Sequence, residues 1–141
     1  MDYHLLFLLA AIAISGLMHF HNLSKCKSVA EHTKGVIRGR HDLLLVRDAI
    51  NLSMKLAIYY IALFIFFIAL LGYWIMSGYP FFAAVGHLFL FGVVTLPMGL
   101  IGKYHEDRLR KMTVQPSNPE LEATYRRYLV QWKEPRFSLP D

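Results

Sequence analysis

Residues 56–76 read LAIYYIALFIFFIALLGYWIM and contain no charged side chain. At 1.5 Å per residue, a helix of this length measures about 30 Å, the thickness of the hydrocarbon core of a bilayer. Two further stretches, about 4–20 and 81–102, also lack Lys, Arg, Asp and Glu. The sequence therefore predicts an all-α membrane protein with three transmembrane helices.

Composition and charge agree with this interpretation. Hydrophobic residues make up 55% of the chain, above the 45–50% of ordinary soluble domains. All 15 Lys and Arg residues lie in 21–55 and 103–141. By the positive-inside rule, both segments are expected in the cytoplasm, with the N-terminus and the 77–80 turn outside, in a cell (inner) membrane. The net charge of +5 then predicts attraction to anionic lipids, and not to nucleic acid, because the basic residues are spread over two juxtamembrane segments.

The charge pattern also divides the chain. We expect a membrane domain over 1–102, interrupted by a cytoplasmic loop over 21–55, and a cytoplasmic tail over 103–141. Within the loop, 41–55 resumes a helical period, which predicts either an interfacial helix or a prolongation of span two. The Ser77–Pro80 turn joins spans two and three into an antiparallel hairpin, and 103–112 is expected to continue span three as a helix.

A second amphipathic helix is predicted in the tail at about 119–133. Asn118 is a good N-cap, and Pro119 suits the first helical position. A helix this short is marginal alone in water, so a partner or the membrane surface is expected to cover its apolar stripe. The stripe consists of Leu121, Tyr125, Tyr128, Leu129 and Trp132.

Span three differs from the bulky span two by its glycines. Gly86, Gly92 and Gly99 have no side chain, and such residues let helices approach closely in membranes. Pro97 is expected to kink the span. Span three is therefore the predicted contact surface for partner helices, whereas span two is expected to face lipid.

His87 is the one ionisable side chain well inside a predicted span. A neutral imidazole can ligate the iron of haem or the magnesium of a chlorophyll-type pigment, so His87 is a candidate cofactor ligand. The spacing Ala83-x-x-x-His87 resembles the pigment-binding element of bacterial light-harvesting polypeptides, which implies the same role. The alternative is a structural His87, hydrogen-bonded to a carbonyl or hydroxyl of a neighbouring helix.

Other candidate chemical groups are few. His19, His21 and His105 are expected near one interface, where they would hold a metal or haem if spans one and three were adjacent, or otherwise sit at headgroup level. The single cysteine, Cys26, is expected to be an ordinary reduced thiol, although Lys25 and Lys27 beside it favour a lowered pKa. The spans contain no acid, which argues against a pump or transporter working alone and against a catalytic activity of the chain by itself.

The leading prediction is a small accessory or scaffolding subunit of a multi-subunit inner-membrane complex, such as an energy-converting or redox complex. Its partners would be other membrane subunits and lipids. The topology is similar to a small membrane subunit of respiratory complex I, but the loop lacks that family's Glu-Cys-Gly element and span two lacks its acidic residue. Two alternatives are a haem- or (bacterio)chlorophyll-binding subunit for electron transfer or light harvesting that uses His87, and a homo-oligomeric, channel-like element lined by span three.

Overall fold

The computed structural model describes residues 3–115 and 119–130. The elements follow in the order α1 (Tyr3–Thr33), β1 (Val36–Ile37), α2 (Arg40–Met76), α3 (Phe81–Arg110), β2 (Thr113–Val114) and α4 (Pro119–Leu129). Helices α1, α2 and α3 are each long and apolar enough to cross a membrane. The predicted all-α membrane fold with three spanning helices and a short C-terminal helix is confirmed.

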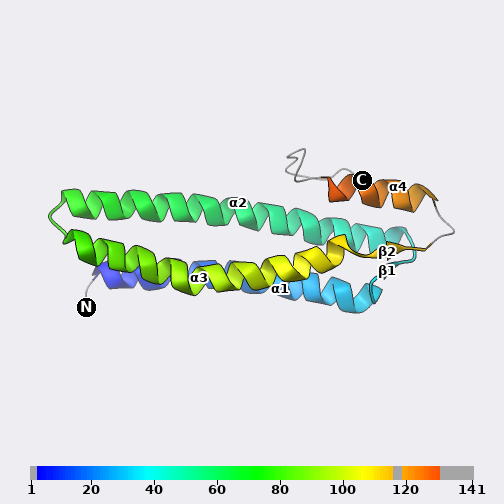
Figure 1. Ribbon diagram of the computed structural model, residues 1–141, viewed down its shortest axis with the longest axis horizontal. Coiled ribbons are helices and arrows are strands. Elements are labelled where there is room, and N and C mark those ends of the chain that lie inside the picture. The colour runs from blue at the N-terminus through cyan, green and yellow to red at the C-terminus, as the bar shows by residue number, and fades with distance from the viewer. Residues whose placement is uncertain (1–2, 116–118, 131–141) are drawn as a thin grey trace.

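The three long helices lie lengthwise beside one another (Figure 1). The start of α1 and the turn between α2 and α3 lie at one end, which we call the hairpin end. The strands and α4 lie at the opposite end, which we call the charged end. Because α2 runs back between the two ends, α1 and α3 are parallel. The connection between α1 and α2, which contains β1, and the segment that follows α3 therefore meet at the charged end.

The helices extend well beyond the uncharged stretches. Helix α1 continues to Thr33, and α2 begins at Arg40, so the expected loop 21–55 is reduced to the short connection that contains β1. The segment 41–55 is therefore the first part of α2, which is the second of the two interpretations of the sequence. Helix α3 continues to Arg110, as predicted for the start of the tail. The charged residues that flank the uncharged stretches therefore do not end the helices.

A parallel pair of two-residue strands closes the charged end, and the sequence did not predict it. Strand β1 pairs with β2, with Val36 opposite Thr113. The Thr113 N–H donates to the Gly35 carbonyl at 3.1 Å. Gly35 has a φ of +80°, a conformation that glycine adopts without steric cost, and it turns the chain out of α1. Because α1 and α3 are parallel and end at the same level, the strands that follow them run side by side in the same direction and can pair.

Two clusters of buried side chains hold the elements together. The hairpin-end core centres on Phe91 of α3, whose ring lies 5.0 Å from that of Phe67 of α2. The charged-end core joins all the elements of that end. It contains Cys26, Val29, Ile37, Leu43, Val46, Ala49, Ile50, Leu109, Met112, Leu121, Tyr125 and Tyr128.

Candidate functional site

His87 is held by its own helix. Its Nδ1 lies 2.6 Å from the Ala83 carbonyl oxygen, so Nδ1 carries the hydrogen and donates it. Its Nε2 is buried and has no hydrogen-bond partner among the described residues. The ring meets that of Tyr79 edge to face at 5.8 Å. A haem or chlorophyll-type metal would be bound through Nε2, and in this conformation the surrounding atoms cover that nitrogen. The acceptor is a carbonyl of the same helix, whereas the structural alternative expected one on a neighbouring helix, and the ligand role stays a prediction.

The glycines of α3 fall into two groups. A Cβ atom at Gly99 would lie 3.4 Å from the His19 Cε1 of α1, and one at Gly102 would lie 3.7 Å from the Asn22 Nδ2. The close approach expected between span three and a partner helix is therefore made at Gly99 with α1 of the same chain. A Cβ at Gly86 or Gly92 would meet no atom within 4 Å.

The apolar stripe of α4 is covered inside the chain rather than by a partner or the membrane surface. Leu121, Tyr125 and Tyr128 are buried in the charged-end core, and Leu129 packs on the same core. Helix α4 lies along α2, so its stripe meets the core that α2 shares with the other elements of the charged end (Figure 1). Trp132, the last member of the predicted stripe, lies outside the described residues.

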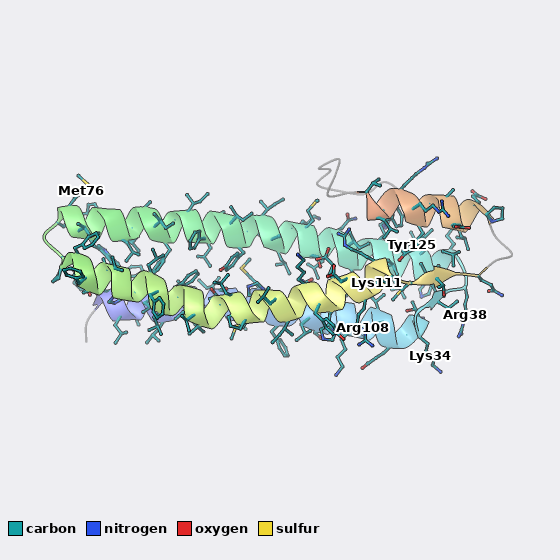
Figure 2. All side chains as sticks on the ribbon, viewed as in Figure 1. Lys34, Arg38, Met76, Arg108, Lys111 and Tyr125 are labelled. Atoms are coloured by element: carbon teal, nitrogen blue, oxygen red, sulfur yellow. The ribbon has the colours of Figure 1, made fainter. Side chains whose placement is uncertain are left out.

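Tyr125 links α4 to the end of α3, where Figure 2 labels it. Its hydroxyl donates to the Leu109 carbonyl at 2.6 Å and accepts the Met112 N–H at 3.1 Å. The two backbone groups belong to the last turn of α3 and the residues after it, which lack partners within the helix. Burial raises the pKa of the Tyr125 phenol, and the Met112 N–H and the Arg110 charge offset part of that increase.

We expect Tyr125→Phe to loosen α4. The substitution leaves the ring in place but removes the partner of two backbone groups, and each buried group left without a partner costs about 1–3 kcal/mol. Limited proteolysis in detergent should cut the variant near α4 faster than the wild type. Tyr59→Phe, which removes the hydroxyl of an exposed tyrosine on α2, is the matched control and should not change the rate.

Alkaline pH should have the same effect on the wild type. A phenol whose pKa is raised on docking stabilises the docked state below the ordinary tyrosine pKa of about 10, and this contribution is lost as the pH rises through the higher value. Proteolysis near α4 should therefore accelerate above about pH 10 in the wild type. The Tyr125→Phe variant lacks this phenol, so its proteolysis should accelerate less at alkaline pH than that of the wild type. If the two proteins gave the same pH profile, the role assigned to the Tyr125 hydroxyl would be contradicted.

Cys26 lies in a small polar cluster between α1 and α2. Its Sγ lies 3.7 Å from the Asn22 Oδ1 and 3.8 Å from the Ser53 Oγ, and the Ser53 hydroxyl donates to the same Asn22 oxygen at 2.6 Å. The exposed fraction of Cys26 is 0%. Lys25 and Lys27 are its neighbours in sequence, but the thiol itself faces the protein interior.

Cys26 should therefore resist maleimide in the folded protein. A reagent must reach the thiolate, and the buried sulfur is accessible only after local opening. Mass spectrometry should find little labelling in mild detergent and complete labelling after denaturation. In a Cys26→Ala background, Ser28→Cys places a thiol at a neighbouring exposed position and should react at once. Equal rates for the two thiols would contradict the burial.

The three histidines considered for a metal are not gathered into a site. Helices α1 and α3 are adjacent, but His19 packs against Gly99, His21 is exposed, and His105 lines a separate hollow beside α1. Over residues 3–115 and 119–130, no three His, Cys, Asp or Glu side chains are placed to hold a metal ion.

A cavity of about 640 Å³ lies between the three long helices, and the sequence did not predict it. Helix α1 contributes His19 and Asn22 to its wall, and α2 and α3 contribute the other sides. The part beside the apolar runs is lined by apolar side chains such as Leu56 and Leu96. The part nearer the charged end is lined by charged residues that follow the apolar run of α3. The charges that follow residue 102 mark its polar part in the sequence, but the cavity itself depends on how the three helices pack.

The volume is within the 300–1,000 Å³ typical of small-molecule sites. At the charged part, Arg110 binds Glu106 through an ion pair of 2.6 Å, with both side chains largely buried. The pair lies one helical turn apart on α3, so it fixes the wall on that side. Lys103 and Asp107 also line this part, and neither has an ion-pair partner among the described residues.

Comparison of the chain with known protein families, with curated proteins and with solved structures finds no significant match.

Proposed function

We propose that this protein is a non-catalytic accessory or scaffolding subunit of a multi-subunit complex in the inner membrane, with its charged end in the cytoplasm. The observation that carries the proposal is the distribution of its contacts. The charged end is held together by its own core, the strand pair and α4, whereas the spanning helices keep large apolar faces exposed. Such a molecule offers rigid helix surfaces to other membrane subunits.

The polar groups within the spans support a structural role. His87 donates to a carbonyl, and the Tyr60 and Thr95 hydroxyls pair at 3.0 Å. Thr95 donates to the Phe91 carbonyl at 2.8 Å. The Tyr60 and Thr95 hydroxyls and the Nδ1 of His87 thus bond to one another or to the backbone, as buried polar groups in a membrane require, while the Nε2 of His87 has no such partner among the described residues. They do not form a nucleophile, base and acid that converge on a substrate.

The basic residues of the charged end support the proposed orientation. Figure 2 labels Lys34, Arg38, Arg108 and Lys111 there, on the two connections and the end of α3. Cations on one end of a bundle favour the cytoplasmic side. Reporter tags on both ends of the chain test this, because the proposed orientation requires the N-terminus outside and the C-terminus inside.

Gly86 gives the sharpest test of partner binding. It is exposed on α3, and a side chain there would meet no atom of this chain. Gentle extraction of the tagged wild type should recover other membrane subunits in a fixed ratio. Gly86→Leu should fold normally and yet lose those subunits, because the added side chain keeps a partner helix at a distance. Gly72→Leu, at an exposed and equally open position on α2, is the matched control.

The same preparation separates the rival functions. Recovery of the chain alone would contradict the proposal, and recovery of several copies of this chain and no other would favour the channel-like alternative. An absorption band of haem or chlorophyll that is altered by His87→Ala would favour the cofactor-binding alternative. A featureless visible spectrum, together with other subunits, is the expected result.

A further inference from the structure

The cavity between α1, α2 and α3 crosses the expected boundary between membrane and water. Leu56 begins the apolar run of α2, Lys103 follows directly after that of α3, and both line the cavity. Along α3 the lining runs from Thr95 to Arg110, a length of roughly 22 Å at the helical rise. An occupant would therefore have a polar part at headgroup level and an apolar part beside the spans. That description fits a membrane lipid.

The wall is open towards the membrane side. Ile61 of α2 and Leu96 and Leu100 of α3 line the apolar part, and each is exposed in the isolated chain. An acyl chain could enter between them from the bilayer without crossing water. His19, Asn22 and Ser53 line the same cavity from α1 and α2, nearer the charged part. They supply polar groups at the depth of a glycerol ester.

The charges of the cavity select among headgroups. Arg110 and Glu106 form an ion pair with each other, and the described lining contains one further cation, Lys103, and one further anion, Asp107. These two residues are four positions apart on α3, so their Cβ atoms lie roughly 5–6 Å apart on one face. A phosphate beside the Lys103 ammonium and a primary ammonium beside the Asp107 carboxylate would satisfy both charges.

We propose that this cavity binds a phospholipid with a zwitterionic phosphoethanolamine headgroup. The phosphate meets Lys103, the ammonium meets Asp107, and one acyl chain lies along the apolar wall. A headgroup with a net negative charge would place its charge beside Asp107 with no cation of its own to offset it. A choline headgroup has no N–H to donate to the carboxylate, and such groups are usually held by aromatic rings. The site does not depend on the proposed function, because it needs no protein partner.

Native mass spectrometry of the delipidated full chain tests the selection directly. The protein is titrated with phosphatidylethanolamine, phosphatidylcholine and phosphatidylglycerol that carry identical chains. We expect the one-lipid complex to form with phosphatidylethanolamine at about two- to fivefold lower lipid concentration than with the other two, the range of an exposed ion pair. Equal affinities, or a preference for phosphatidylglycerol, would overturn the proposal.

Two substitutions assign the selectivity to the cavity. Asp107→Asn should remove the preference for ethanolamine over choline, and Lys103→Gln should weaken binding of all three lipids. Lys111→Gln removes an exposed cation of the same end that does not line the cavity, and it should leave the order of affinities unchanged. If Asp107→Asn kept the wild-type preference, the headgroup assignment would be wrong.

A third substitution tests the acyl-chain position. Ala57 is a small, half-buried residue of the apolar wall, and Ala57→Phe would fill part of the cavity. We expect this variant to lose the one-lipid complex with every headgroup while its thermal unfolding in detergent stays close to that of the wild type. Retained binding with a normal unfolding transition would place the lipid elsewhere. If Ala57→Phe fails to fold, Ala57→Leu, with the smaller side chain, is tested in its place. Loss of the one-lipid complex is again the expected result, and retained binding would again place the lipid elsewhere.

Discussion

Ile50→Ala is expected to lower the free energy of unfolding by about 2–5 kcal/mol, the largest of the expected effects on stability. The exposed fraction of Ile50 is 0%, and it belongs to the charged-end core. Truncation removes apolar atoms from that core and leaves a cavity among rigid neighbours. At this end the unfolded side chain would meet water, so the loss includes the hydrophobic transfer term.

Ile65→Ala is the matched control on the same helix. Ile65 is 61% exposed and lies within the apolar run 56–76. In a membrane or micelle it would face hydrocarbon both before and after unfolding, and lipid tails are as apolar as the side chain itself. The unfolding temperature in detergent should fall clearly for Ile50→Ala and hardly at all for Ile65→Ala. Equal changes would mean that the charged-end core does not stabilise the fold.

Gly99→Leu is expected to separate α1 from α3. A Cβ at this position already lies 3.4 Å from the His19 ring, so the remaining atoms of leucine would press against that ring. Overpacking of this kind costs about 1–3 kcal/mol or forces the backbones apart. Because the polar cluster of Asn22 and Ser53 and the cavity wall lie beside this contact, both would be disturbed.

The native cysteine can report that separation. Gly86→Leu adds the same side chain to the same helix at an open position, so it should leave the α1–α3 contact unchanged. Reactivity of Cys26, which bonds to Asn22, provides the readout. Gly99→Leu should make Cys26 react faster with maleimide, and Gly86→Leu should not. If neither variant changed the rate, the Gly99 contact would not hold the helices together.

The helices could be predicted well because they depend on local properties. The length and uncharged character of 56–76 are sufficient for a span, and Ser77–Pro80 for a turn. The start of the short tail helix could also be predicted, because Pro119 suits its first position and α4 begins there. The extents of α1 and α2 could not be predicted in the same way, since their charged parts are stabilised by contacts between Val29 and residues far along the chain.

The candidate site shows the same division. Gly99 and the α4 stripe were singled out for contacts with other molecules or lipid, and the structure shows contacts of these residues within the chain. A stripe or a glycine indicates only that something must cover it. That α1 and α2 supply the cover is a matter of long-range geometry. The cavity was not predicted at all, because it is the space that three particular helices leave between them.

By itself, the sequence determined that the chain forms three spanning helices and that its cations lie in the two segments 21–55 and 103–141. Hydrophobic length and charge are local properties, which can be read from the residues of each segment alone. The tertiary structure alone decided that α1 packs against α3, that β1 and β2 pair, and that a cavity of about 640 Å³ lies between α1, α2 and α3. Those features depend on which faces of the helices meet, and that choice is made by packing among residues distant in the chain.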